Sequence, residues 1–453
     1  MAEFKSSAID CGVVEAVQTQ AFDVVVIGGG PAGMAAALAA HKTGARVAVV
    51  EREQHLGGIL RQCIHPGFGL SHFKQELTGP ECAQRFIDQV RATDIALFLN
   101  SMVIGIDSGE PTEDAALHTV TLMSPAGMLQ LTGRAVVLAM GCRERTRSEI
   151  KIPGSRPAGV FTAGLAQRYI NIENLKPGSR AVILGSGDIG LIMARRCTLE
   201  EISVEGVYEL MPYANGLRRN VKNCLDDFGI PLHLSTTVTR VIGHDRVEAV
   251  EVSQVDEHLA PIPGTERIVP CDTLLLSVGL IPENELSVAA GVELDPHTRG
   301  AVVDQSLQTG VPGIFACGNV LHVHDLADNV TTESERAGAA AAAYALGNGA
   351  DDEVGAAGTG CELTVSPAGI AGYALPGRIT AVALTKLNFR VRRPVDTARV
   401  RILANGEEMF AGKVRAFKPS VMESFPLPAK VIQHALDLGV SEIVLSVDPV
   451  EEA

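Results

Sequence analysis

Two glycine-rich turns constrain the fold of this chain more than any other feature. The first, "GGGPAG" at residues 28–33, follows the apolar run "FDVVVI" and leads into a run rich in Ala and Met. The second, "GSGDIG" at residues 185–190, follows "RAVIL" and starts 157 residues later (185 − 28 = 157). A buried strand that turns through Gly-x-Gly-x-x-Gly into a helix is the start of a parallel β-α-β unit. The sequence therefore predicts an α/β fold with two Rossmann-like units in one chain.

A glutamate ends the strand that follows each of these predicted helices. Glu51 follows "RVAVV", and Glu209 follows "VEGVY". The glycine turn and the helix N-terminus can bind a pyrophosphate, while the carboxylate accepts hydrogen bonds from ribose hydroxyls. Two dinucleotide sites are therefore expected. Glu209 favours NAD(H), because it would repel a 2′-phosphate, but Arg218 and Arg219 nearby leave NADP(H) open.

Three later apolar segments end in glycine, as strands do when backbone must pass close to a ligand. They lie at residues 133–145, 271–286 and 310–325, and a long Ala/Gly-rich helix is expected from about 331 to 346. We expect these segments to complete the two nucleotide sites.

The order of these motifs resembles that of the flavoproteins with two dinucleotide-binding domains, which include the glutathione-reductase and thioredoxin-reductase types. Shorter stretches, such as "GILRQCIHPGFG" and "GSGDIGLIMARR", resemble the FAD/NAD subunits of opine oxidases, hydrogen cyanide synthase and dye-linked proline dehydrogenase. The resemblance implies two three-layer ββα domains, with an NAD domain inserted in an FAD domain, and FAD and NAD(P)H as cofactors. It also implies electron transfer within a complex, in which the partner is another flavoprotein or an iron–sulfur protein.

The expected domains follow from the motif positions and the resemblance. They are an N-terminal extension (1–20), an FAD-binding domain (21–151 and 281–350), an NAD(P)-binding domain (152–280) and a small C-terminal α+β interface domain (366–453). In that last domain, alternating apolar residues around an Asn405-Gly406 turn predict antiparallel strands, and "LPAKVIQHALDLGV" and "SEIVLSVDP" predict a helix and a strand. Residues 350–365 read as a linker.

Cofactor residues are assigned from the glycine motifs and the resemblance together. The FAD residues are Gly28, Gly30, Pro31, Ala32, Gly33, Glu51, Arg52, Gly58, Ile59, Leu60, Ala139, Gly141, Gly318, Asn319 and Val330. The NAD residues are Gly185, Gly187, Asp188, Ile189, Gly190, Glu209 and Gly279. Asn319 departs from the family, which carries an aspartate at this position. The helix beginning near Val330 is expected to point its N-terminus at the flavin.

Cysteine spacing argues against a thiol–disulfide reductase. Of nine cysteines, no two form C-x-x-C or C-x₄-C, the spacings typical of a redox disulfide, a zinc site or an iron–sulfur cluster. Cys63 lies five residues past Gly58, where the glutathione-reductase type has cysteines two and seven past the corresponding glycine. Those two positions are Leu60 and His65 here.

Candidate catalytic residues are Cys63, His65 and His324. Cys63 is either a reactive thiol beside the flavin or a packing residue, and His65 is either a proton donor or part of a loop. His322 and His324 have the spacing of two metal ligands, but without further clustered Cys or His no metal is expected. Lining the flavin site and a purely structural role both remain open for this segment.

Composition narrows the function classes. Lys and Arg number 38 against 53 Asp and Glu, a net charge of −15, and a chain this acidic has no general attraction for nucleic acid. No apolar run reaches the roughly 18 residues that span a bilayer. The N-terminus lacks an export signal pattern, so a cytoplasmic protein is expected.

Three functions fit these observations. The first is an FAD-dependent oxidoreductase that exchanges hydride with NAD(P)(H) and passes electrons to a partner, in a homo- or hetero-oligomer. The second oxidises an amine, opine or hydroxy-acid/polyol substrate directly at the flavin. The third is a non-catalytic flavoprotein scaffold, which the two intact glycine motifs disfavour.

Overall fold

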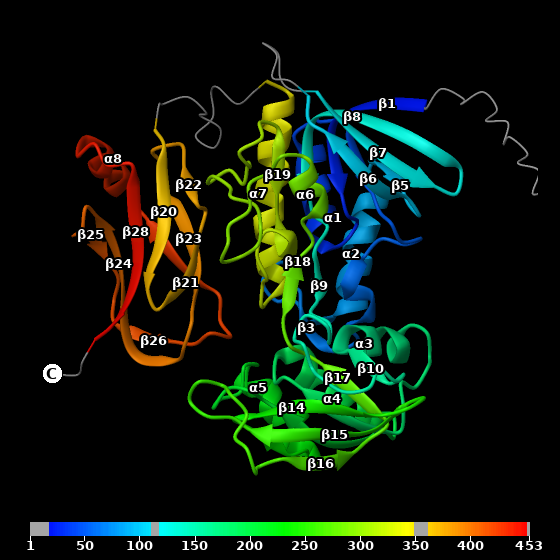
Figure 1. Ribbon diagram of the computed structural model, residues 1–453. Helices are drawn as coiled ribbons and strands as arrows, with labels where there is room; N and C mark the ends of the chain where they lie inside the picture. The colour runs from blue at the N-terminus through cyan, green and yellow to red at the C-terminus, as the bar shows by residue number, and fades with distance from the viewer. Residues whose placement is uncertain (1–17, 110–116, 348–360, 451–453) are drawn as a thin grey trace, which may run out of the picture.

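The computed structural model describes residues 18–109, 117–347 and 361–450. The chain forms three units (Figure 1): a first unit built from two separate stretches of sequence, a second unit inserted between them, and a C-terminal unit that lies beside α7. Residues 1–17 of the expected N-terminal extension, with Cys11, lie outside the described residues, as does most of the expected linker.

A seven-stranded sheet in the order β5-β2-β1-β8-β7-β6, with β19 also paired to β8, forms the first unit. Its strands are β1 (Gln18–Ile27), β2 (Val47–Val50), β5 (Ala96–Phe98), β6 (Met102–Asp107), β7 (His118–Ser124), β8 (Gly127–Leu138) and β19 (Ile314–Ala316). Around it lie α1 (Pro31–Lys42), α2 (Gly79–Arg91), α6 (Glu285–Ala289), α7 (Ala327–Ala345), η1 (Gly58–Gln62), η3 (Gly318–Val320) and the short pair β3 (Pro66–Phe68) and β4 (Leu77–Thr78).

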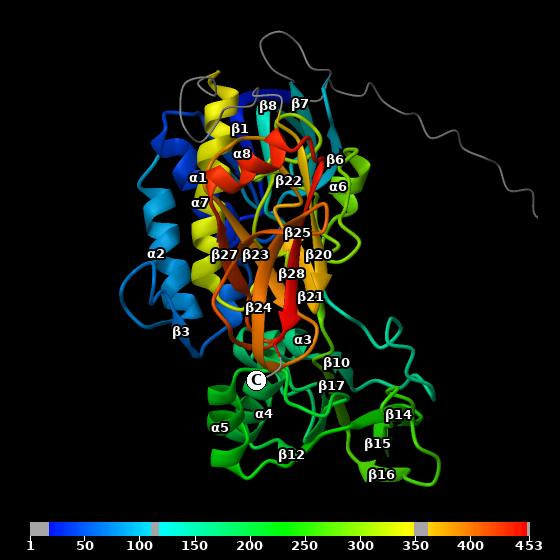
Figure 2. The same ribbon diagram turned by 90° about the vertical axis from the view of Figure 1, so that its left-hand side faces the viewer.

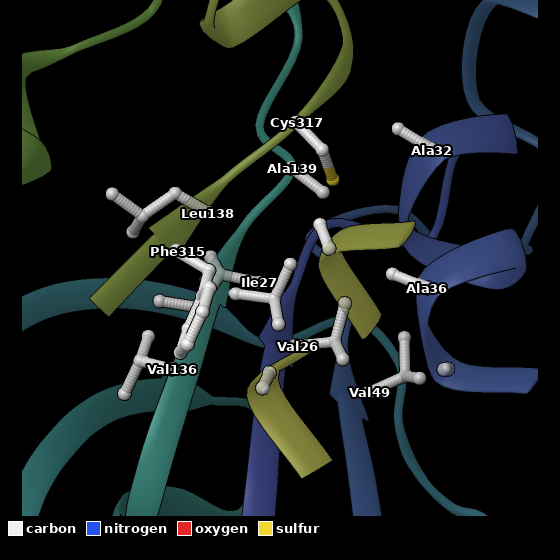
Figure 3. Close-up of a cluster of buried hydrophobic side chains, with 14 of the residues drawn as sticks. Val26, Ile27, Ala32, Ala36, Val49, Val136, Leu138, Ala139, Phe315 and Cys317 are labelled. Atoms are coloured by element: carbon white, nitrogen blue, oxygen red, sulfur yellow. The ribbon is translucent and has the colours of Figure 1, made fainter. Parts of the chain in front are cut away.

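Small side chains let α1 and α7 pack closely beside this sheet. A Cβ atom on Gly338 of α7 would lie 2.0 Å from the carbonyl oxygen of Ala36 in α1. Figure 3 shows part of this core, where Val26 of β1 and Val49 of β2 lie beside Ala36 of α1, and Phe315 of β19 lies further along the sheet. This core holds the ends of β1, β8 and β19 together at the edge where the glycine motifs lie.

A five-stranded parallel sheet in the order β10-β17-β11-β12-β13 forms the second unit. It comprises β10 (Val160–Thr162), β11 (Arg180–Leu184), β12 (Ser203–Tyr208), β13 (Leu232–His233) and β17 (Thr273–Leu276), with α3 (Ala163–Asn171), α4 (Asp188–Leu199), α5 (Arg218–Cys224) and η2 (Asp226–Phe228). A separate antiparallel sheet contains β14 (Thr236–Gly243), β15 (Val247–Gln254) and β16 (Arg267–Pro270).

Alternation along β11 shows how these elements form three layers. Ile183 packs in the core that the helices share, whereas Val182 and Leu184 pack in the core shared with β14 and β15. Successive strand residues point to opposite faces of a sheet, so the parallel sheet lies between a helical layer and a β layer. Together with the first unit, this confirms the predicted α/β fold class of Rossmann-like units with a ββα layer order.

The chain passes between the two units through paired strands. β9 (Cys142–Glu144) leads out of the first unit and β18 (Leu280–Pro282) leads back, and the two pair antiparallel with Arg143 opposite Ile281. The connections therefore run side by side, as an inserted unit requires.

Two β-sheets and one helix form the C-terminal unit (Figure 2). Its strands are β20 (Leu363–Gly369), β21 (Ala371–Leu375), β22 (Arg378–Ile379), β23 (Thr385–Val391), β24 (Val395–Ala404), β25 (Glu407–Ala411), β26 (Arg415–Phe417), β27 (Glu423–Leu427) and β28 (Glu442–Pro449), and its helix is α8 (Ala429–Asp437). The predicted hairpin turn is present, with positive φ at Asn405 and Gly406 between the antiparallel strands β24 and β25. One pair, β20 with β28, is parallel, which the antiparallel prediction did not include.

Three element boundaries differ from the sequence predictions. β1 starts at Gln18, inside the expected extension, because residues 18–20 pair with 129–131 of β8. β20 starts at Leu363, before the expected domain start at 366, because it pairs with β22 and β28. α7 starts at Ala327 instead of near Val330. Within the described residues, no helix combines the length and apolar character needed to cross a membrane.

Candidate functional site

The three glycines of the first turn differ in the space around their missing side chains. Gly28 has φ +110°, and a Cβ there would lie 2.4 Å from the carbonyl oxygen of Ala139. A Cβ on Gly33 would lie 1.7 Å from the Gly28 carbonyl oxygen, so α1 packs on β1 through this position. A Cβ on Gly30 would meet nothing closer than Gly58 at 3.9 Å. Close packing thus excludes side chains at the first and third glycines, and open space at the second leaves room for a pyrophosphate.

The second turn repeats this division. Gly185 has φ +99°, and a Cβ there would lie 2.0 Å from the Ser277 carbonyl oxygen. A Cβ on Gly190 would lie 2.6 Å from the carbonyl oxygen of Gly185, while one on Gly187 would meet only Ser277 Oγ at 3.6 Å. Both expected nucleotide sites therefore have the same backbone cradle, a turn whose first and third glycines are closely packed and whose second glycine faces open space.

Both glutamates fold back onto their glycine turns. Glu51 Oε2 accepts a hydrogen bond from the Gly29 amide at 2.7 Å, and Glu209 Oε2 accepts one from the Ser186 amide at 2.9 Å. Both side chains are buried, so each carboxylate is held beside its turn, where the ribose of a bound dinucleotide would lie. The residues therefore fit two dinucleotides.

The segment around Gly318 returns to the first turn. Gly318 has φ +72°, and a Cβ there would lie 2.8 Å from Ala32 Cβ and 3.3 Å from Val330 Cγ1. Three expected FAD residues are thus brought together from η3, α1 and α7. Gly141 also has positive φ, with open space around its missing side chain.

Asn319 uses both ends of its amide. Its Oδ1 accepts from the His324 amide at 3.0 Å, and its Nδ2 donates to Cys142 Sγ at 3.5 Å. Burial raises the pKa of the Cys142 thiol to about 11. An aspartate has no N–H to donate to this sulfur, which gives a physical reason for asparagine here.

The remaining expected cofactor residues differ in exposure. Gly58 lies against Gly30, Ile59 is exposed and so is Arg52. Leu60 is a core side chain, so its backbone alone remains for a cofactor contact. Pro31, Ala139, Asp188, Ile189 and Gly279 lie at the expected strand and helix ends.

Cys63 lies in the contact between the first and second units. Its Sγ is 3.8 Å from Gln167 Oε1 on α3, and its neighbour Gln62 donates to Gln167 Oε1 and to the Gly164 carbonyl oxygen. Burial raises the pKa of the Cys63 thiol to about 12. The nucleophile in thiol chemistry is the thiolate, so this environment favours the packing role.

His65 lines a cavity of about 450 Å³ between the units. Asp188, Arg195 and Arg219 of the second unit line the same cavity, as do residues 325–327 at the start of α7. Burial lowers the pKa of His65, so its imidazole is neutral at pH 7. The structure therefore brings His65 together with Asp188, an expected NAD residue.

His324 lies in a buried cluster instead. Its Nε2 is 3.4 Å from Glu333 Oε2, and His322 Nε2 is 2.9 Å from the same oxygen. His322 Nδ1 lies 3.1 Å from the hydroxyl of Tyr373 in the C-terminal unit, and Gly318 donates its amide to Glu333 Oε1 at 2.8 Å. The three candidate catalytic residues thus occupy three different environments.

Sequence reasoning missed several residues of these sites. Glu333 and Tyr373 carry no local signal, because a glutamate in a polar helix is usually exposed and Tyr373 is distant in sequence. Arg195 lies on α4 and gave no motif. Asp328 had a usable signal, since acidic residues favour the first turn of a helix. Its carboxylate accepts from the amides of Gly69 and Ser71, which fixes the loop after β3.

Comparisons with known proteins agree with this geometry. The profile of the family described as "Pyridine nucleotide-disulphide oxidoreductase" matches residues 22–345. One of the opine oxidase subunits of Agrobacterium tumefaciens (strain Ach5) is 26% identical over 66% of this chain and 61% of its own length. Hydrogen cyanide synthase subunit HcnB of Pseudomonas protegens is 28% identical over 59% of each chain. The chain thus spans about three fifths of the length of these two relatives.

Solved structures show the same fold. A thioredoxin reductase of T. acidophilum superposes with a TM-score of 0.57 at 23% identity, covering 73% of this chain and 99% of the other. L-proline dehydrogenase of P. horikoshii superposes with a TM-score of 0.51 at 20% identity, covering 75% of this chain and 57% of the other. The matched region of the family profile ends at residue 345, so the C-terminal unit lies beyond it.

Proposed function

We propose that this chain, which belongs to the pyridine nucleotide-disulphide oxidoreductase family, exchanges hydride between NAD(P)H and FAD and passes electrons to a partner protein or other acceptor. The chain is an FAD- and NAD(P)-binding oxidoreductase. The flavin supplies the hydride and electron chemistry, and the protein supplies binding, orientation and electrostatics.

The observation that carries the proposal is the pair of matching cradles. Each has a glycine turn with an open second glycine and a buried glutamate beside it, Glu51 in one and Glu209 in the other. One chain therefore has the residues to bind FAD and a pyridine nucleotide at once. No acid–base pair is needed for hydride transfer between these two groups.

Cysteine geometry supports an acceptor outside this chain. The eight cysteines among the described residues are free thiols, and Cys63, near the expected flavin site, is held protonated by burial. Relatives named as subunits of opine oxidase and hydrogen cyanide synthase support a partner protein. We propose that this partner is another flavoprotein or an iron–sulfur protein, in a homo- or hetero-oligomer.

Anaerobic titration of the purified, FAD-loaded chain with NADH and then NADPH tests this function. We expect about one equivalent of one nucleotide to bleach the visible flavin absorbance, and an added one-electron acceptor to restore it. Bleaching by an amine, opine or hydroxy acid but not by either nucleotide would contradict hydride exchange. Failure of every reductant to bleach bound FAD would favour a non-catalytic flavoprotein scaffold.

Direct oxidation of a substrate at the flavin is the second candidate function, and the cavity at His65 favours it. This cavity is lined by two cationic side chains that can bind a carboxylate, Arg195 and Arg219, and by three acidic ones, Asp188, Asp227 and Asp325. Neutral His65 can accept a proton there. An opine or hydroxy acid has a carboxylate that the arginines can bind and an amine or hydroxyl proton that His65 can accept. Under this function, Arg219→Ala would abolish bleaching by the acid while leaving bleaching by NADH unchanged.

A further inference from the structure

The strongest unassigned feature is the buried cluster of His322, His324 and Glu333. We propose that it is a binding site for one divalent first-row transition ion, of which zinc is the reference case. The ligand atoms would be one ring nitrogen of each histidine and Oε2 of Glu333. One such atom from each of the three residues lies within 4.8 Å of the others.

The spacing of these atoms is that of ligands around a single ion. Glu333 Oε2 is 2.9 Å from His322 Nε2 and 3.4 Å from His324 Nε2. With metal–ligand bonds of about 2.0–2.1 Å, these separations correspond to ligand–metal–ligand angles of roughly 90° and 110°. The three ligand atoms lie within 4.8 Å of one another, and two bonds of this length span at most about 4.1 Å. The histidine rings would therefore turn toward Glu333 as the ion binds.

His324 is the residue that needs a further partner. Its side chain is 1% exposed, yet neither ring nitrogen makes a hydrogen bond of good geometry within the described residues. A buried polar group without a partner destabilises the folded protein. An ion bound at Nε2 would remove that destabilisation for one of the two nitrogens.

The other two ligands already have the outer contacts that metal ligands require. His322 turns Nδ1 to the Tyr373 hydroxyl at 3.1 Å, which leaves Nε2 facing Glu333. Glu333 Oε1 accepts from the Gly318 amide, which leaves Oε2 facing the histidines. Metal-bound histidines usually have such a partner on the second nitrogen, because it fixes the ring orientation.

This ligand set indicates the class of ion. Two imidazoles and one carboxylate suit zinc and its first-row neighbours, in contrast to the all-oxygen ligands of Mg²⁺ or Ca²⁺. Three protein ligands leave a fourth position open. Glu333 binds the amide of Gly318, and His324 binds Asn319 through its own amide, so the ion would lie behind the expected flavin segment. Tyr373 makes the C-terminal unit part of the site.

Elemental analysis of the full-length, FAD-loaded protein tests the proposal. After dialysis against a weak chelator we expect close to one transition ion per chain, and after a strong chelator and re-addition of Zn²⁺ the same stoichiometry. Zinc-edge X-ray absorption should show nitrogen and oxygen ligands and no sulfur. Outer-contact changes alone typically weaken metal binding about 10- to 100-fold, so loss of a ligand in His324→Asn should weaken it at least that much.

Two further variants distinguish loss of the ion from loss of the folded structure. Glu333→Gln keeps the shape and the acceptor for the Gly318 amide but removes the ligating charge, so it should fold, bind FAD and lose the ion. His297→Ala removes an exposed histidine beside Asp295 and should leave the ion content unchanged. Less than about a tenth of an ion per folded, zinc-treated chain would overturn the proposal. Unchanged zinc affinity in both Glu333→Gln and His324→Asn would also overturn it.

Discussion

Glu51 and Glu209 occupy equivalent positions in the two units. Replacing each with glutamine should weaken the binding of one cofactor and not of the other. A hydrogen bond to a charged acceptor is worth about 1–2 kcal/mol more than one to a neutral acceptor. Glu51→Gln should therefore weaken FAD binding about tenfold, as measured by flavin retained after gel filtration and by titration of the apoprotein.

Glu209→Gln should leave the flavin content unchanged and raise the NADH concentration needed for half-maximal flavin reduction about tenfold. Glu53→Gln is the matched control for Glu51, because Glu53 touches this site through its backbone amide alone while its side chain pairs with Arg168. Equal losses of FAD in Glu51→Gln and Glu209→Gln would contradict the assignment of one glutamate to each cofactor.

Cys63 should behave as a partly buried, protonated thiol. With its pKa raised from 9.0 to about 12, the thiolate fraction at pH 8 is about a thousandfold below that of an ordinary thiol. Alkylation of Cys63 in the folded protein, followed by mass spectrometry, should be negligible at pH 8 and increase only as the pH approaches the raised pKa. The same peptide in urea should react readily.

Cys63→Ser should retain the flavin and its bleaching by NADH, since serine keeps a donor for Gln167 Oε1. Loss of bleaching in a folded, flavin-loaded Cys63→Ser protein would instead assign Cys63 a redox function. Rapid alkylation in the native state at pH 8 would speak against the buried environment.

Residues of the two cradles could be predicted because their signal is local. A glycine at a tight turn and a glutamate at a strand end are short-range patterns, and the family resemblance supplied their order. The cluster around Glu333 could not be predicted, because His322, Glu333 and Tyr373 meet only when the C-terminal unit packs on the segment before α7. Two histidines with no third ligand in the local sequence argued against a metal.

At the scale of elements, α7 shows why the start of a helix could not be predicted from the sequence. Its N-cap is Leu326, which provides no side-chain cap, so the usual Ser, Thr, Asp or Asn signal is missing. β1 likewise starts with four exposed residues, 18–21, and lacks the apolar alternation of a half-buried strand. The strands ending in the glycine motifs were predictable because they are buried on both faces.

Asp328 in the first turn of α7 should control the loop after β3. Its two carboxylate oxygens accept from the Gly69 amide at 3.0 Å and the Ser71 amide at 2.6 Å. Asp328→Ala should therefore release both amides, at a cost of about 1–3 kcal/mol. Hydrogen exchange should increase at residues 69–74, and proteases should cut there first.

Asp94→Ala provides the control for Asp328→Ala, because the Asp94 side chain is 92% exposed and its one ion-pair partner is His41. It should leave exchange at residues 69–74 unchanged. Equal protection of these amides in Asp328→Ala and the parent protein would show that other contacts hold the loop.

At the scale of the whole molecule, Arg390 joins the C-terminal unit to the segment that leads from Gly318 to α7. Its guanidinium donates to the carbonyl oxygens of Val323 and Pro419, and it lies 3.8 Å from the Asp325 carboxylate. The Asp325 carboxylate also accepts from the Met422 amide. The C-terminal unit, which faces the viewer in Figure 2, therefore fixes the loop that carries the buried histidines.

Arg390→Ala should loosen both sides of this contact together. Removing it leaves two carbonyl groups and a largely buried carboxylate without a cationic partner, a loss of about 1–3 kcal/mol. Hydrogen exchange should rise in residues 322–326 and in residues 415–427, and FAD should dissociate faster because Asn319 and Gly318 belong to the same segment.

Arg401→Ala is the matched control, because Arg401 pairs with Glu408 and Asp448 inside the C-terminal unit and is more exposed. Exposed ion pairs contribute about 0–1 kcal/mol, so exchange should change only near β24 and β25, with no effect on FAD release. If Arg390→Ala raised exchange in the C-terminal unit alone, the two units would be mechanically independent. A joint increase would instead make the C-terminal unit a structural part of the expected flavin site, although it lies beyond the residues that the family profile matches.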